Sequence, residues 1–251
     1  MFGGKGGGKD GLRKQAQKIT AKFGPPENRQ KVIDQLAAMD SAEALSTLCL
    51  RFTIRSDTGI TDDEEKERVR QILVEAGDKA VAPVKDFLEG HESGVSWGLR
   101  VLAALRPPED VVATALRLLH RLGREYTRDP EKKLVLLSWL AEHHGDLTST
   151  AVAGGDDPAL EDTLPPLLED FSDDVRIATV RVLTNQPLTD RTRVALVELF
   201  LRDKDNARVR GEVLEALALL GADVKGYRPS VEALLVEPYF LDKEGRVKKR
   251  G

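Results

Sequence analysis

The chain has 251 residues, of which 41% are hydrophobic, 32% charged and only 5% aromatic. This composition excludes a disordered tail, and its richness in leucine, alanine and valine favours packed helices over a β-sandwich. The single cysteine, Cys49, excludes an internal disulfide and a cysteine-based metal site, and its apolar neighbours predict a buried, unreactive thiol.

Hydropathy and charge set further bounds. The sequence has no apolar run of about 18 residues that would span a bilayer, and its first residues lack the apolar segment of a secretion signal. We therefore expect a cytoplasmic protein. The net charge of −4 is distributed unevenly, because residues 1–24 carry +5 and residues 242–251 carry +3, which leaves −12 on the remainder.

The opening stretch, MFGGKGGGKDG, contains the letters of a phosphate-binding loop, G-x-x-x-x-G-K, from Gly3 to Lys9. In nucleotide hydrolases this loop follows a buried strand and ends in a Ser or Thr whose hydroxyl binds Mg²⁺. Here no strand fits before Gly3, and Asp10 occupies the place of the hydroxyl. We expect no nucleotide or other cofactor, and residues 1–11 are predicted to form a flexible basic arm.

Residues 12–23 are predicted to form an amphipathic helix with several lysines and an apolar face made of Leu12, Ala16, Ile19 and Phe23. One interpretation is that the helix covers the end of a helical array while its lysines are solvated. The alternative is attraction to an anionic surface, either nucleic acid or a membrane. The candidate contacts for such a partner are Lys5, Lys9, Arg13, Lys14, Lys18 and Lys22.

A repeated spacing of apolar residues runs through the rest of the chain. Val175 is followed by apolar residues at +5 and +8, and so is Val209, which places all three residues of each set on one helical face. The same frame begins at residues 28, 64, 97, 132, 175 and 209, although its first position is polar at Glu64 and Lys132. Successive starting points are 33 to 43 residues apart, and intervals of this size are the signature of helical repeat arrays.

Each interval also has room for a helix ahead of the framed one. The candidate stretches are 12–23, 41–52, 79–90, 109–123, 159–171 and 191–203. Six helix pairs are therefore predicted. The longest interval contains GDLTSTAVAGGDDP, residues 145–158, whose composition predicts an extended loop.

The segment LPPLLEDFSDDVRIATVRVL resembles a HEAT or HEAT-like repeat, and AVAPVKDFLEG is similar to the first half of one. The resemblance implies an all-α fold, a right-handed α-solenoid of about six pairs over residues 12–236. It also implies a ladder between neighbouring repeats, in which an Asp of the inter-helix turn pairs with an Arg of the second helix. Asp170 or Asp173 with Arg176, and Asp205 with Arg210, are the candidates for that ladder.

Some HEAT-like solenoids are DNA glycosylases that hold the duplex in a basic groove, so this resemblance also implies an enzymatic alternative. The acidic body argues against it, because binding phosphates requires clustered Lys and Arg. The candidate basic residues outside the ends are Arg100, Arg117, Arg121, Arg124 and Arg128.

Metal and hydrolase chemistry have little support. His143 and His144 are adjacent, so on a helix they point about 100° apart and cannot bind one ion together; we expect them to interact with a helix C-terminus. His91 and His120 lie in separate pairs. We therefore predict a protein that is not an enzyme and has no metal site.

Two aromatic residues are the candidates for protein binding. Tyr126 lies in the predicted loop GREYTRDPEKK, and Trp139 lies at the edge of the predicted buried face of its helix. A half-buried structural role is the alternative for Trp139.

Residues 237–251 are predicted to form a hairpin or a basic tail. The function predicted for the whole chain is a scaffold or adaptor that binds another protein along one face of the solenoid. Binding of an anionic surface by the basic arm is the alternative.

Overall fold

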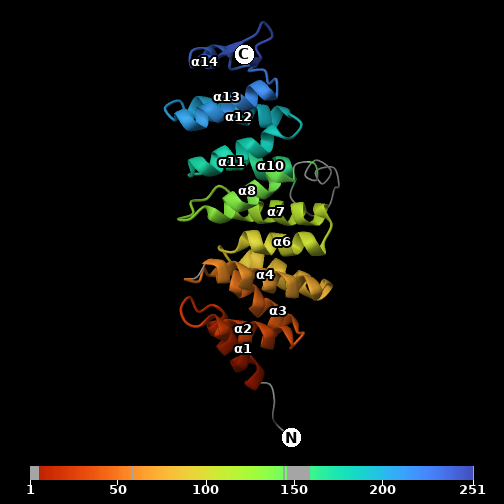
Figure 1. Cartoon of the computed structure of the whole chain (residues 1–251). Coiled ribbons are helices and arrows are strands. Elements are labelled where there is room, and N and C mark those ends of the chain that lie inside the picture. Colours follow the sequence, from red (N-terminus) through yellow and green to blue (C-terminus); the bar gives the residue numbers. More distant parts are fainter. Residues whose placement is uncertain (1–5, 58, 144, 146–158, 251) are drawn as a thin grey trace. The chain divides into compact units, whose positions relative to one another are not determined.

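A computed structural model describes residues 6–57, 59–143, 145 and 159–250. Within these residues the regular elements are helices apart from one two-stranded sheet, which confirms the all-α class (Figure 1). The chain divides into two compact units, Met1–Val111 and Val112–Gly251, and each contains its own buried apolar side chains. None of the described helices combines the length and the apolar composition needed to cross a bilayer.

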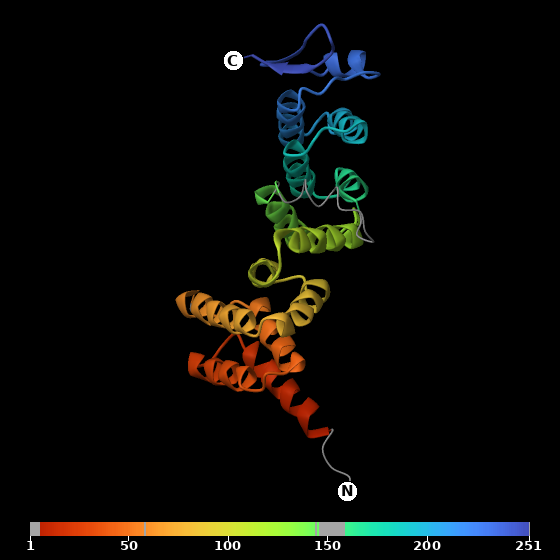
Figure 2. The ribbon, with the colours of Figure 1, turned by 90° about the vertical axis from the view of Figure 1, so that its right-hand side faces the viewer.

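The first unit consists of helices in two layers (Figure 2). Its elements are α1 (Gly6–Ile19), α2 (Pro26–Ala37), α3 (Ala42–Cys49), the 3-10 helix η1 (Leu50–Thr53), α4 (Gly59–Glu75), α5 (Asp78–Gly90) and α6 (Val95–Leu105). Helix α3 contacts α1 on one side and α5 on the other, and α4 likewise contacts α2 and α6. Each helix therefore packs against its counterpart in the neighbouring pair.

The second unit repeats this arrangement. Its elements are α7 (Pro108–Leu122, which begins before the unit boundary), α8 (Glu131–Glu142), α10 (Leu160–Leu167), α11 (Asp173–Thr184), α12 (Asp190–Arg202), α13 (Ala207–Leu219), α14 (Arg228–Glu232), β1 (Tyr239–Leu241) and β2 (Val247–Lys249). Helix α11 contacts both α8 and α13, and α12 contacts both α10 and α14. Helix α14 is an additional element that the repeat frame does not predict.

A helix lies at each of the twelve positions that the repeat frame predicts, and the frame also identifies the core. The residue at +5 is buried in every framed helix: Ile33, Val69, Leu102, Leu137, Val180 and Leu214. Apolar residues on one helical face leave water together when the helices pack, and this burial is the main source of stability.

The N-terminal prediction differs from the structure in two respects. Helix α1 begins at Gly6, so the part of the predicted arm from Gly6 onward is helical. The helix also ends at Ile19, and Phe23, which was expected on its apolar face, is 77% exposed in the following turn. Gly24 has φ of +108°, a conformation that favours glycine and turns the chain towards α2. The predicted loop 145–158 lies outside the described residues, apart from Gly145.

Two glycines allow close packing around η1 and α5. Gly94 has φ of +78°, and a Cβ atom there would lie 2.6 Å from the carbonyl oxygen of Phe52. At Gly98 a Cβ would lie 2.7 Å from Cδ2 of Leu88. The absence of a side chain at both positions lets α6 approach its neighbours.

Residues 239–249 form an antiparallel hairpin, which is one of the two alternatives for the C-terminus. Tyr239 pairs with Lys249 across the strands, and Val247 is fully buried. The Tyr239 hydroxyl and the Lys249 ammonium both donate to Oε2 of Glu215 on α13, at 2.5 and 2.7 Å. The hairpin is therefore attached to α13 by polar contacts as well as by burial.

Candidate functional site

A cluster of five charged side chains is buried in the first unit. Arg29 comes from α2, Arg51 from η1, and Asp62, Glu65 and Lys66 from α4, and each is at most 8% exposed. The Nε atom of Arg29 donates to both carboxylate oxygens of Glu65, at 3.2 and 2.9 Å. Glu65 also accepts from Nε of Arg51 at 2.7 Å. A single carboxylate therefore joins two buried guanidinium groups.

The second carboxylate of the cluster is Asp62. It accepts from Nη2 of Arg51 at 2.7 Å and from the backbone N–H of Ser56 at 2.8 Å, and Lys66 lies 2.7 Å away. Buried charges are stable only when they are paired and hydrogen-bonded, so these contacts hold η1 and α4 in one geometry. Sequence reasoning missed this cluster because its members come from α2, η1 and α4 and meet only in the folded unit.

The pH dependence of stability should reveal the Asp62 contacts. Burial raises the pKa of this carboxyl, but hydrogen bonds from Lys66, Ser56 and Arg51 outweigh burial and hold the pKa well below its usual range. A lowered folded-state pKa contributes stability above the unfolded pKa, roughly pH 4, and this contribution is lost as the pH falls. We expect the melting temperature of Asp62→Asn to lie below that of wild type at pH 7, with the gap narrowing towards pH 3. A gap that stays constant from pH 7 to pH 3 would contradict this assignment.

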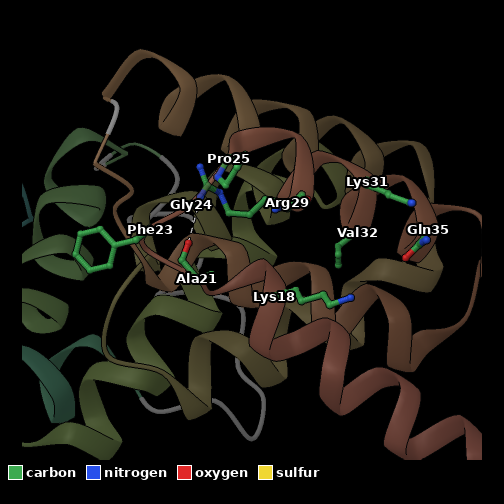
Figure 3. Close-up of a pocket in the computed structure, with 10 residues that line it drawn as sticks. Lys18, Ala21, Phe23, Gly24, Pro25, Arg29, Lys31, Val32 and Gln35 are labelled. Carbon is green, nitrogen blue, oxygen red and sulfur yellow. Dashed lines mark hydrogen bonds between the residues drawn. The ribbon is translucent and has the colours of Figure 1, made fainter.

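A cavity of about 500 Å³ lies beside this cluster, between the end of α1 and the start of α2 (Figure 3). It is lined by Lys18, Ala21, Phe23, Gly24, Pro25, Asn28, Arg29, Lys31, Val32 and Gln35. Figure 3 shows Phe23, Gly24 and Pro25 at one side, while Lys18, Lys31 and Gln35 extend to the other. Among the described residues, three cations (Lys18, Arg29 and Lys31) and no carboxylate line this cavity.

The basic residues predicted to contact an anionic partner are only partly described. Lys5 lies outside the described residues. Lys9 belongs to α1, but its side chain is not described. The side chains of Arg13, Lys14, Lys18 and Lys22 are exposed, and none of them forms an ion pair within the described part of the chain. Of the described side chains among these candidates, only that of Lys18 lines the cavity.

Cations of the second unit connect successive inter-helix turns. Lys133 on α8 donates to the carbonyl of Glu125 in the preceding turn at 2.8 Å and to Oδ2 of Asp170 in the turn after α10 at 2.6 Å. Lys133 and Asp170 are 1% and 3% exposed. The pair is therefore a buried salt bridge that spans two helix pairs.

Arg176 on α11 makes the corresponding contacts one pair further along. It donates to the carbonyl of Asp170 and to Oδ1 of Asp173, both at 2.5 Å, and its Nε lies 3.0 Å from Oδ2 of Asp203. The predicted pairing of Arg176 with Asp173 is therefore present within one helix. The carboxylate that reaches Arg176 from the next pair is Asp203.

The predicted pairing of Asp205 with Arg210 is wrong. Asp205 is exposed, and Arg210 donates instead to the carbonyls of Lys204 at 2.8 Å and Leu234 at 2.6 Å. The guanidinium also lies over the ring of Phe200, 5.3 Å from its centroid. Packing on that ring and two carbonyl acceptors fix the arginine away from Asp205.

An exposed aromatic pair lies at the turns of the second unit. Tyr126 follows α7 and Phe171 precedes α11, and their rings meet edge to face with centroids 6.0 Å apart. The two residues are 69% and 71% exposed. In the same two turns Arg124 forms an ion pair with Glu169. Phe171 was not identified from the sequence, although an aromatic residue between Asp170 and Ser172 in a polar turn was the available signal.

Trp139 is not part of this pair. It lies in the last turn of α8 and stacks on His143 with ring centroids 4.2 Å apart, whereas Tyr126 lies before the start of that helix. Its side chain is half-buried, and no described residue accepts a hydrogen bond from its Nε1 atom. The structure therefore favours the alternative of a half-buried structural tryptophan.

The other candidate groups for chemistry are dispersed. His143 contacts the carbonyl of Trp139 through Nδ1 at 2.8 Å, as expected at a helix C-terminus, and His144 lies outside the described residues. Burial raises the pKa of the Cys49 thiol to about 12. No group of three or more His, Cys, Asp or Glu side chains in the described part of the chain is placed to hold a metal ion.

The chain matches no protein-family model, and it has no match among the curated proteins or the solved structures. Any statement about function therefore rests on the geometry of the two units.

Proposed function

We propose that the chain is a non-enzymatic scaffold that binds another protein through the exposed aromatic pair Tyr126 and Phe171. The proposal includes a right-handed α-solenoid of about six HEAT-like helix pairs. It is supported by the contacts within each unit, where helices pack against their counterparts in the neighbouring pair. Repeat arrays with such packing commonly present extended binding surfaces.

The observation that carries the proposal is the exposure of two aromatic rings that already pack against each other. A protein partner that covers them removes a large apolar area from water, and aromatic side chains dominate binding energy at many interfaces. Their edge-to-face contact also restrains both rings before binding, which reduces the entropy lost on association. The partner is a protein segment that presents an apolar side chain to this pair.

We also place this function in the cytoplasm. The single cysteine is buried as a free thiol, which suits a chain that does not depend on disulfides.

The test compares wild type with Tyr126→Ala/Phe171→Ala in affinity capture from cell extract, followed by binding measurements with the purified partner. The double variant should bind that partner at least about 30-fold more weakly, the effect of losing a binding hot spot of about 2 kcal/mol. Leu219→Ala/Val236→Ala is the matched control, because these apolar residues are 69% and 54% exposed elsewhere in the same unit. Equal retention of all captured proteins by wild type and the aromatic variant would refute the proposal.

A further inference from the structure

The cavity between α1 and α2 contains an incompletely bonded buried cation. Arg29 is 1% exposed, and its Nε and Nη1 atoms donate to Glu65 and to the carbonyl of Ala21. Its Nη2 atom is buried and has no hydrogen-bond partner within the described part of the chain. Buried donors in folded proteins nearly always have an acceptor, so the unpaired Nη2 atom indicates a binding position for an acceptor group beside it.

The charge balance around Arg29 points to the same conclusion. The buried cluster contains three cations, Arg29, Arg51 and Lys66, and two carboxylates, Asp62 and Glu65. It therefore carries one excess positive charge in an environment where an uncompensated charge is costly. An anion beside Arg29 would both neutralise this excess and accept a hydrogen bond from Nη2.

The cavity has further features that suit an anion. Within the described part of the chain, Lys18 and Lys31 line it without forming ion pairs, and no acidic side chain lines it. Helix α2 begins here, and Pro25 at its N-cap position offers no side-chain cap. The positive end of the helix dipole therefore faces a site with three cations.

We propose that this cavity binds a phosphate monoester, with Arg29 as the fixed contact and Lys18 and Lys31 closing over the phosphate group. Arginine presents a rigid fork of donors, whereas lysine has a flexible stem that can move towards a bound anion. A dianion matches three cations better than a carboxylate does. The volume of about 500 Å³ exceeds that of phosphate alone, and Phe23, Pro25 and Val32 would contact the organic part of the ligand.

The test is a titration of the full chain with inorganic phosphate, followed by amide chemical shifts of Gly24 and Asn28 in ¹H–¹⁵N spectra. Phenyl phosphate and a phosphoserine peptide are separate arms, which distinguish a small organic phosphate from a phosphorylated protein as the source. We expect saturable shifts with inorganic phosphate and tighter binding in at least one organic arm. Acetate should produce no comparable shift, and equal binding of acetate would overturn the assignment to phosphate.

The variants avoid Arg29, whose removal would leave Glu65 without one of its partners and would confound binding with folding. Lys18→Gln/Lys31→Gln should weaken phosphate binding at least tenfold. The control Lys14→Gln/Lys22→Gln removes the same charge from exposed residues of α1 and the following turn that do not line the cavity, and it should bind as wild type does. Absence of saturable binding, or equal weakening in both double variants, would overturn the proposal. Because the ligand arms use purified protein, their outcome does not depend on the aromatic pair.

Discussion

Replacing Glu65 with glutamine is expected to lower the free energy of unfolding by about 3–5 kcal/mol, because the change leaves two buried guanidinium groups without their shared carboxylate. In the folded chain Glu65 accepts hydrogen bonds from Arg29 and Arg51, and all three side chains are at most 2% exposed. Glutamine has nearly the same shape as glutamate, so the decrease in unfolding free energy measures the effect of charge rather than of packing. The measurement is chemical denaturation followed by circular dichroism.

The matched control is Glu67→Gln, two residues further along α4. Glu67 pairs with Arg70, and the two side chains are 41% and 28% exposed. Partly exposed ion pairs contribute about 1 kcal/mol or less, so we expect a small loss. Similar losses in the two variants would show that the buried cluster contributes no more than a surface pair.

Asp170→Asn is expected to destabilise the second unit by about 3 kcal/mol or more, because Lys133 would then carry a buried charge with no carboxylate. The Lys133 ammonium lies 2.6 Å from Asp170, and Asp170 also accepts from the backbone N–H of Ser172. Asparagine can still accept that second bond, so the variant isolates the ion pair. Chemical denaturation monitored by circular dichroism measures the decrease in unfolding free energy.

Two further variants test whether charge is responsible. Asp174→Asn removes an exposed carboxylate that pairs with Arg208, and this control should cost less than about 1 kcal/mol. Lys133→Met added to Asp170→Asn should recover part of the lost stability, since neither charge then remains unpaired. The single variant Lys133→Met completes the comparison. If the double variant loses as much unfolding free energy as the two single variants lose together, the buried pair is not the cause.

The positions of the helices were predictable because they depend on local periodicity. The frame of 0, +5 and +8 places its second residue inside every framed helix, from Ile33 to Leu214, because one face of a helix must be buried whatever the neighbouring helix is. The prediction was less accurate at the N-terminus, where α1 begins at Gly6 rather than at residue 12. Helix ends depend on a few weak contacts, so periodicity does not specify them.

The candidate sites were predictable only in part. Tyr126 was identified from its place in a loop, but its partner Phe171 lies 45 positions later and meets it only in the folded unit. The resemblance to HEAT repeats implied a pairing of Asp205 with Arg210, whereas the arginine is held by backbone carbonyls and the ring of Phe200. Contacts of long side chains depend on backbone geometry that spacing does not contain.

By itself the sequence determined the all-α class, the twelve framed and preceding helices and the apolar faces that they bury, because apolar periodicity acts within one helix. Only the tertiary structure decided which charged residues are buried. Arg29 and Glu65 are 36 positions apart, and nothing in their local sequence distinguishes them from solvated residues. Their burial follows from the packing of α2 against α4, which excludes water from the space between them and makes each charge depend on a partner from another helix.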